Sequence, residues 1–414
     1  MGKVGKNHAM LITMAWLMYT IAYLGKYSCN ANVSGLMAEF NVGKGAAGLI
    51  PSCFFFAYGA SQIINSFFCD RYNTRFMPAA CMFISAALNV VVGFTKYFPI
   101  IKYLWIINGA TLAVIWPMLV KTLGENLNPN ETAKSVVIMG TTTPLGTAAA
   151  YGLSALLTEL NAFRAIFHIA GVIMPLLGLL WIVFYGKMTG NGAKAEAEAI
   201  NPIEPPKVKH KKFTPPMVTT IIMFGAFIPF VQIVKDGLQT WLPSLLQEVF
   251  GYKPSISLIL TLILPLSGAP GTFVAVQMNK KIKNLIPLCL TQMAITLACV
   301  AVAYTGISLT LALLLILGCV LGYCFIYGIN NVMANLFPLS LGKEYNIGFV
   351  SSFLNGLSYV GSTVSAYGLG VFSTKFGWNG MFILFMVTLG VLISVGTVIY
   401  FIFRKKLNNN PLTE

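Results

Sequence analysis

Two lysines interrupt long apolar stretches of the chain, Lys26 near its start and Lys235 just past its middle. A charged side chain in the hydrocarbon of a membrane costs on the order of 2.5–3.5 kcal/mol, so such a residue normally faces a cavity and has a function. Two ammonium groups that faced one cavity would attract an anion. The alternative for each lysine is that it snorkels to the membrane surface or pairs with a carboxylate.

The residues around the first lysine form a polar helix face. Tyr19, Tyr23 and Lys26 are spaced at i, i+4 and i+7, which places them on one side of a helix. Asn30 follows one helical turn after the lysine. Ammonium, hydroxyl and amide groups can all bind the polar atoms of an anion, so we predict that this face lines a substrate cavity.

The second lysine repeats that arrangement. Gln232, Lys235 and Gln239 share one helix face, and the last of them lies four residues after the lysine. Asp236 points about 100° away around the helix, so we expect it to neutralise its neighbour poorly. With two tyrosines from later segments, the predicted substrate site consists of Tyr19, Tyr23, Lys26, Asn30, Gln232, Lys235, Gln239, Tyr327 and Tyr359.

The composition indicates what holds these residues in place. Of 414 residues 57% are hydrophobic and only 9% are charged, which is typical of a protein with many membrane segments. Apolar stretches long enough to cross a bilayer core about 30 Å thick recur along the chain. We predict twelve membrane helices at residues 9–36, 46–69, 76–95, 98–124, 134–159, 163–187, 216–248, 255–279, 285–304, 308–340, 347–372 and 376–403.

The net charge of +15 follows this predicted membrane topology. With both termini in the cytoplasm, eighteen Lys and Arg fall on the cytoplasmic side, six on the outer side and three within the segments. This asymmetry agrees with the positive-inside rule and predicts a multi-pass protein of the cell (inner) membrane. The basic fringe can attract anionic membrane lipid, and we exclude nucleic acid as a partner.

The chain also divides into two similar halves. Lys26 lies fourteen residues before a phenylalanine and Lys235 fifteen, and the Ala-Tyr-Gly at 150–152 recurs at 366–368. A hydrophilic, lysine-rich stretch separates the halves, which predicts a cytoplasmic linker. We therefore predict an all-α membrane protein of the major facilitator fold, with twelve transmembrane helices in two six-helix bundles related by pseudo-two-fold symmetry. The predicted domains are an N-terminal bundle at 1–187, the linker at 188–215 and a C-terminal bundle at 216–414.

A charged loop joins the second and third predicted helices. Asp70, Arg71 and Arg75 lie between two apolar segments. Such a loop can pair with neighbouring helix ends in one conformation and release them in another, so we predict a gating role. A plain solvated turn is the alternative. The corresponding loop at 279–284 keeps the basic charge and lacks the acid.

The motifs of common enzyme classes are missing from the sequence. It has no Gly-rich phosphate loop and no Ser/His/Asp or Cys/His order, so we predict a protein that is not an enzyme. The eight cysteines fall inside the predicted segments without metal-ligand spacing. We therefore expect no metal site and no cofactor.

Several short motifs resemble one family. The segments at 23–27, 58–62 and 70–78 are similar to those of the organophosphate:phosphate antiporter family of the major facilitator superfamily, which includes the glycerol-3-phosphate transporter group. The likeness continues at Trp116-Pro117, at Trp241 with Pro243, and at residues 326–328 and 376–380. The loop at 70–78 is the most specific of these pieces.

The resemblance implies roles for individual residues. In that family an arginine on the first helix and another on the seventh bind the phosphate, and tyrosines on the first helix match Tyr19 and Tyr23. The residues that stand in the places of the two arginines, a helix-five histidine and a helix-two lysine are Lys26, Lys235, Thr143 and Gln62. Lysine is a point charge without the planar fork of arginine, so the resemblance implies an anionic substrate bound in a different manner.

Together these patterns predict a secondary active transporter that binds a small organic anion, an organophosphate or a similar compound, between its halves. It would work by alternating access and by exchange, with inorganic phosphate as the counter-substrate. One alternative is a symporter of carboxylates with H⁺ or another cation. Another is a sensor that binds a sugar phosphate without transporting it.

Overall fold

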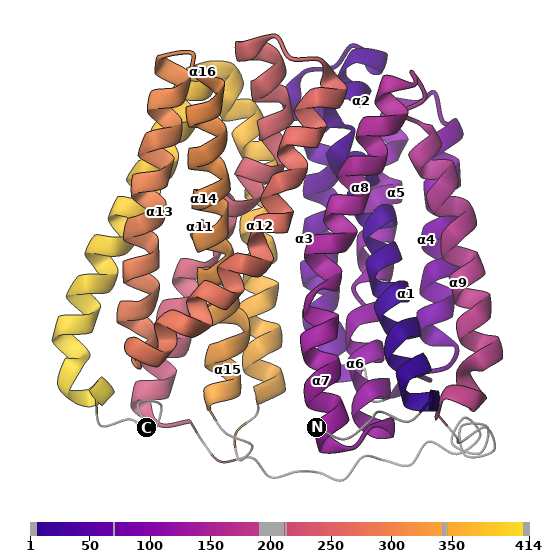
Figure 1. Cartoon of the computed structure of the whole chain (residues 1–414), viewed down its shortest axis with the longest axis horizontal. Coiled ribbons are helices and arrows are strands. Elements are labelled where there is room, and N and C mark those ends of the chain that lie inside the picture. The colour runs from indigo at the N-terminus through magenta and orange to yellow at the C-terminus, as the bar shows by residue number, and fades with distance from the viewer. Residues whose placement is uncertain are drawn as a thin grey trace.

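The computed structural model describes residues 6–68, 71–189, 211, 213–341, 345 and 347–408. Within these ranges all regular structure is helical and there is no strand. The long helices run side by side in two groups, with the first half of the chain in one group and the second half in the other (Figure 1). The predicted all-helical fold is confirmed.

The first bundle contains the helices that precede the linker. They are α1 (Lys6–Ala31), α2 (Val33–Phe40), α3 (Lys44–Phe68), α4 (Met77–Phe94), α5 (Phe98–Leu112), α6 (Ile115–Asn126), α7 (Pro129–Gly140), α8 (Thr142–Glu159) and α9 (Ala165–Thr189). Local residues explain where several of these helices begin or end. Asn128 and Glu131 form a capping box at the start of α7, and Asn41 closes α2 in the left-handed conformation.

The second bundle follows. Its helices are α11 (Pro215–Phe250), α12 (Pro254–Lys281), α13 (Leu285–Ser308), α14 (Ala312–Asn331), the π-helical turn η2 (Val332–Leu336), α15 (Phe337–Ser340) and α16 (Ile347–Asn408). Gly251 ends α11 at φ 66°, a conformation that glycine adopts without steric cost. Of the predicted linker at 188–215, residues 190–210 and 212 lie outside the described residues.

Ten stretches of the described chain are long and apolar enough to cross a membrane. One of them, Phe349–Ile402, has 54 residues and bends at Gly377, where φ is 69°, so it makes two crossings. The predicted fifth helix is divided at Thr141 into α7 and α8 and is not among the ten. Together these account for the twelve predicted crossings.

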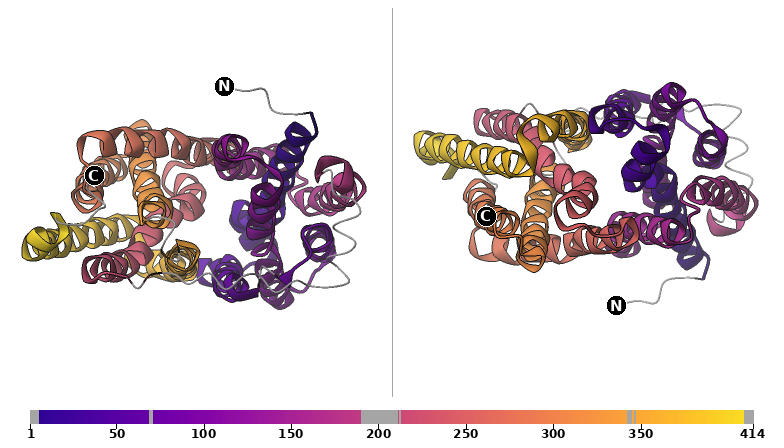
Figure 2. Two further views of the ribbon diagram at one scale, coloured as in Figure 1. Left: turned by 90° about the horizontal axis from the view of Figure 1, so that it is seen from below. Right: turned by 90° about the horizontal axis from the view of Figure 1, so that it is seen from above.

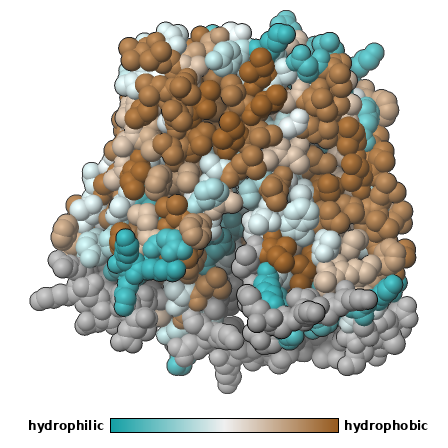
Figure 3. Space-filling view, viewed as in Figure 1, coloured by the Kyte–Doolittle hydropathy of each residue, from teal (hydrophilic) through white to brown (hydrophobic). Residues whose placement is uncertain are grey.

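Buried apolar side chains form two large clusters, each made mainly of residues from one bundle. Apolar residues also cover the outer surface, where Phe94 is 72% exposed and Leu313 is also 72% exposed (Figure 3). A water-soluble protein would not leave such a surface uncovered, whereas hydrocarbon covers it at no cost. The chain is a multi-pass membrane protein.

The bundles meet along two helix pairs, α3 with α16 and α8 with α12 (Figure 2). The two backbones approach closely at Gly48, where an added Cβ atom would lie 2.3 Å from the backbone oxygen of Ala366. A larger residue at this position would push the bundles apart. Small residues therefore let the two backbones touch beside the space that holds the functional side chains.

Candidate functional site

A cavity lies between the two bundles. Figure 3 shows the surface hollowed there, with pale and teal residues between the brown surfaces of the bundles. Seven of the nine predicted substrate contacts line the cavity, all except Asn30 and Gln239. The lining is Tyr19, Tyr23, Lys26, Tyr27, Phe55, Gln62, Trp116 and Thr143 from the first bundle and Gln232, Lys235, Asp236, Tyr327, Asn330, Asn335, Asn355, Ser358 and Tyr359 from the second.

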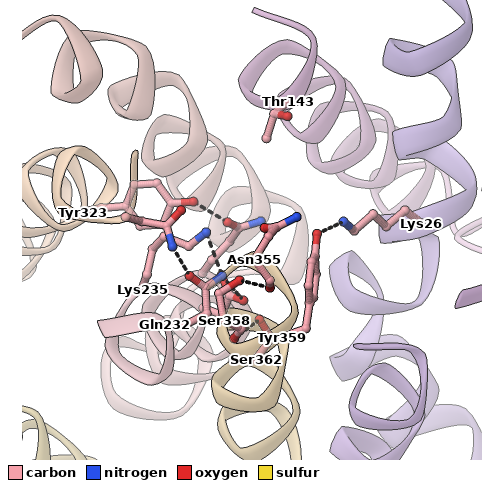
Figure 4. A network of polar contacts seen from close by, with 12 residues as sticks. Lys26, Thr143, Gln232, Lys235, Tyr323, Asn355, Ser358, Tyr359 and Ser362 are labelled. Carbon is pink, nitrogen blue, oxygen red and sulfur yellow. Dashed lines mark hydrogen bonds and ion pairs between the residues drawn. The ribbon is translucent and has the colours of Figure 1, made fainter. Parts of the chain in front are cut away.

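Lys26 of α1 is only 4% exposed. Its Nζ donates a hydrogen bond to the hydroxyl of Tyr359 on α16 at 3.2 Å, across the two bundles (Figure 4). Five aromatic ring centroids lie 4.2–5.9 Å from this nitrogen, and the ring of Tyr58 is the nearest. In the described part of the chain, no ion pair joins Lys26 to a carboxylate. The faces of the rings stabilise the cation electrostatically and leave its charge without a formal counterion.

Lys235 of α11 has a different environment. Its Nζ lies 3.3 Å from Oδ1 of Asp236, and the two side chains are 12% and 6% exposed. The expectation that Asp236 would neutralise its neighbour poorly was wrong, because the flexible four-carbon stem of lysine reaches back across the 100° that separates the two residues. The Lys235 ammonium therefore enters the cavity as half of an ion pair.

Amide side chains extend this ion pair into a network. Gln232 Nε2 donates to Asp236 Oδ2 at 2.9 Å, and Gln232 Oε1 accepts from Asn330 Nδ2 at 2.8 Å. The network joins α11 to the end of α14. Both polar atoms of the Gln232 amide and both oxygens of the Asp236 carboxylate have a partner, which orients this carboxylate at the cavity wall.

Tyrosine hydroxyls line the side of the cavity that belongs to the first bundle. Tyr23 shares a hydrogen bond with the hydroxyl of Thr143 on α8 at 2.9 Å, and Tyr19 lies 3.4 Å from the hydroxyl of Tyr58. The ring of Tyr19 also packs against Trp116, with centroids 4.7 Å apart. Thr143 points into the same space as Lys26 (Figure 4). The first bundle thus offers hydroxyl groups and one ammonium group.

The two predicted amides outside the lining are both buried. Asn30 is 2% exposed, and neither its Oδ1 nor its Nδ2 has a hydrogen-bond partner among the described residues. Gln239 accepts from the hydroxyl of Tyr323 at 2.6 Å, but its Nε2 has no partner in the same part of the chain. Their role in binding stays a prediction.

The predicted gating loop is described in part, since Asp70 lies outside the described residues. The guanidinium of Arg71 lies 5.7 Å from the ring centroid of Phe68. Arg75 Nε donates to the backbone oxygen of Ile182 on α9 at 3.3 Å. These contacts hold the loop against its own bundle, and a gating role for the three charged residues stays a prediction.

Polar contacts join the bundles at the end opposite the start of α1 (Figure 1). Lys44 Nζ lies 2.6 Å from Glu248 Oε2 and 4.3 Å from the ring centroid of Trp378. Trp378 Nε1 donates to the same Glu248 oxygen at 2.9 Å, and the hydroxyl of Ser255 donates to Glu159. These contacts have to break for the cavity to open at this end.

The predicted site omitted several lining residues. Asn355 donates a hydrogen bond to Gln62 across the bundles, and both amides lie within apolar segments, a signal that could have identified them. Tyr27 follows Lys26 directly and lies off the predicted helix face, yet it also lines the cavity. Its ring stacks on Tyr23 with centroids 5.6 Å apart, a contact that the i, i+4 spacing of the two tyrosines allows and that the sequence could have indicated.

The family model described as Major Facilitator Superfamily matches residues 15–366. The chain belongs to the Major Facilitator Superfamily. This agrees with the fold and with a cavity between two bundles. The protein is therefore a membrane transporter and not an enzyme, as predicted. Among the described residues, no group of three His, Cys, Asp or Glu side chains is placed to hold a metal ion.

Curated relatives of this superfamily member cover nearly its whole length. It is 22% identical over 392 residues to a probable hexose phosphate transport protein of Chlamydia pneumoniae. That alignment covers 88% of this chain and 85% of the relative. The chain is 21% identical over 407 residues to a phosphoglycerate transporter protein of Salmonella typhimurium, covering 92% and 86%. These relatives agree with the resemblance to the organophosphate:phosphate antiporter family.

Solved structures support the fold. A bacterial homologue of the human lysosomal transporter Spinster superposes with a TM-score of 0.74 at 16% identity, covering 97% of this chain and 98% of that one. At this level of identity the similarity concerns the backbone architecture alone. It does not assign roles to the side chains in the cavity.

Proposed function

We propose that this transporter carries a small phosphorylated organic anion across the membrane, with Lys26 and Lys235 binding its anionic group. One observation carries the proposal: the two ammonium groups belong to different bundles and line one cavity. An anion between them interacts with both bundles at once and draws them together. Such closure around a midplane site is the step that alternating access requires.

The choice of a phosphorylated substrate rests on the relatives, whose names refer to hexose phosphate and phosphoglycerate. The cavity supports it through many hydroxyl and amide donors, which suit the three oxygens of a phosphate group. Tyr19, Tyr23, Gln232, Tyr327 and Tyr359 would bind its remaining polar atoms. We extend the proposed site to Asn30 and Gln239, which would come into reach when the bundles move.

We infer that transport proceeds by exchange. Lys26 is a buried cation without a carboxylate partner in the described chain. Closing the empty cavity around this charge is unfavourable, and a bound anion removes the penalty. The transporter then reorients readily only when it is loaded, which couples the export of one anion to the import of another. Inorganic phosphate is the proposed counter-substrate.

In the proposed orientation the protein spans the cell (inner) membrane with both termini on the cytoplasmic side. The linker at 188–215 and the loop with Asp70, Arg71 and Arg75 lie on the same side. This orientation rests on the excess of Lys and Arg in those segments. The first and last described helices agree with it, because α1 begins and α16 ends at the same end of the molecule (Figure 1). The contacts of Lys44 would then lie on the outer side.

Counterflow tests this function directly. The purified protein is placed in liposomes loaded with inorganic phosphate, and uptake of labelled phosphate and of labelled glycerol 3-phosphate is measured. We expect uptake that requires internal phosphate and that Lys26→Gln abolishes. Uptake into liposomes without an internal anion, driven by an imposed proton gradient, would contradict exchange. Absence of uptake for every phosphate compound would contradict the phosphorylated substrate.

A further inference from the structure

The charge of the cavity lining is lower than the two lysines suggest. Among its described lining residues, only Lys26, Lys235 and Asp236 are of the acidic or basic types, because the others are Tyr, Trp, Phe, Thr, Ser, Asn and Gln. Two positive charges and one negative charge leave a net charge of +1. The aspartate therefore halves the charge that an anionic ligand meets.

This balance selects among ligands by their charge. An uncompensated charge inside a protein that excludes water is strongly unfavourable. A simple phosphate ester carries about −1.5 to −2 near pH 7 and would leave excess negative charge in the closed cavity. A ligand of net charge −1 leaves the closed cavity neutral.

Asp236 can also bind a cationic group directly. Its Oδ1 faces the Lys235 ammonium at 3.3 Å, and its Oδ2 accepts from Gln232 at 2.9 Å. A carboxylate has about four acceptor positions, so these two partners leave capacity for further donors. An ammonium group on the ligand could occupy that capacity. The phosphate of the same ligand would then lie between the two lysines.

We propose that Asp236 sets the charge of the preferred ligand at −1, so that among phosphate esters this transporter prefers those that also carry an ammonium group. The inference rests on the proposed function, since it concerns ligands of the same cavity. In this arrangement Lys26 and Lys235 bind the phosphate from opposite bundles. Asp236 binds the ammonium, and each charged group in the cavity has a partner of opposite sign.

Two phosphate esters of similar size test this inference. Ethanolamine phosphate carries an ammonium group, and glycerol 3-phosphate carries hydroxyls in its place. Binding of each to the purified full chain is measured by calorimetry at about pH 8, where both phosphates are fully ionised. We expect the wild-type protein to bind ethanolamine phosphate about tenfold more tightly, a difference of about 1.4 kcal/mol. Asp236→Asn should reverse this order, and Asp236→Glu, which keeps the charge, should retain it.

The wild-type ratio decides the matter even if a variant fails to fold. Equal affinity, or tighter binding of glycerol 3-phosphate, overturns the role of Asp236 and leaves the proposed function intact. If neither ester binds, the proposal of a phosphorylated substrate is wrong. Two carboxylates, lactate and malate, then test the preference for a ligand of net charge −1 by itself. Lactate should bind more tightly than malate. A preference for malate, or no binding of any anion, overturns the inference.

Discussion

Lys26 and Lys235 lie at matching places in two similar halves, but their surroundings differ. Lys26 is surrounded by aromatic rings and one tyrosine hydroxyl. Lys235 is paired with a carboxylate that an amide holds in place. Two physical solutions to the same problem, a cation in a medium of low dielectric, therefore occur on opposite walls of one cavity.

The difference teaches that a sequence repeat does not imply equal roles. An arriving anion meets no competing carboxylate at Lys26, whereas at Lys235 it has to compete with Asp236 for the same ammonium group. We therefore infer that Lys26 supplies most of the attraction. Lys235 adds less, and its neighbour adjusts the charge that is accepted.

The largest expected effect is the loss of Lys26. Lys26→Gln keeps a long polar side chain and removes the charge. A hydrogen bond to a charged group contributes about 1.5–3 kcal/mol, so anion affinity should fall on the order of 100-fold. Lys235→Gln should cost on the order of tenfold, because Asp236 already offsets that charge. Calorimetry with a phosphate ester measures both.

The exposed Lys96 provides the matched control for this comparison. Lys96→Gln removes the same charge outside the cavity and should leave affinity within about twofold, because solvent screens it. Equal losses for Lys26→Gln and Lys235→Gln would contradict the asymmetry of the two walls.

A second prediction concerns stability, for which we expect Lys235 to matter more than Lys26. Lys235→Gln leaves Asp236 buried without its ion-pair partner, and such a loss costs about 3–5 kcal/mol. The apparent Tm in detergent should fall by about 5 °C or more. The double variant Lys235→Gln/Asp236→Asn should recover most of this loss. A double variant as unstable as the single one would show that the ion pair is not the cause.

Much of the fold was predictable, because hydrocarbon imposes simple rules on a sequence. A membrane helix needs about 20 apolar residues, and this length marked nearly every crossing. The turn at Gly377 lies beside the predicted gap between the helices at 347–372 and 376–403. The division at Thr141 was not predicted, because the segment at 134–159 was taken as one helix.

The site was predictable where helical spacing decided it. Tyr19, Tyr23 and Lys26 share a face by periodicity, and all three line the cavity. The partner of Lys235 was not predictable in this way, since a side chain of four carbons can bend toward a residue beside it. The contact of Lys26 with Tyr359 joins residues 333 positions apart. Helical spacing relates only residues that are close in the sequence, so it could not predict this pair.

A third prediction compares two tyrosines of the second bundle, one beside each lysine. Tyr359 accepts a hydrogen bond from Lys26 at 3.2 Å, whereas Lys235 lies 5.4 Å from the ring centroid of Tyr327. We expect Tyr359→Phe to weaken anion binding about tenfold, because its hydroxyl and the Lys26 ammonium would bind the same anion. Tyr327→Phe should weaken binding less than threefold or so, since its ring remains. A larger loss from Tyr327→Phe would mean that the surroundings of Lys235 contribute more to anion binding than those of Lys26.

The smallest effect tests whether aromatic faces stabilise Lys26. Its Nζ lies 4.2 Å from the ring centroid of Tyr58. A desolvated cation–π contact contributes about 1–2 kcal/mol, so Tyr58→Leu should weaken anion binding by several-fold, because Lys26 loses the nearest of the aromatic rings that stabilise its charge. Tyr58→Phe removes only the hydroxyl and should bind nearly as the wild type does. If Tyr58→Phe binds as poorly as Tyr58→Leu, the hydroxyl contact with Tyr19 matters and the ring face does not. The two lysines would then differ only in the carboxylate beside Lys235.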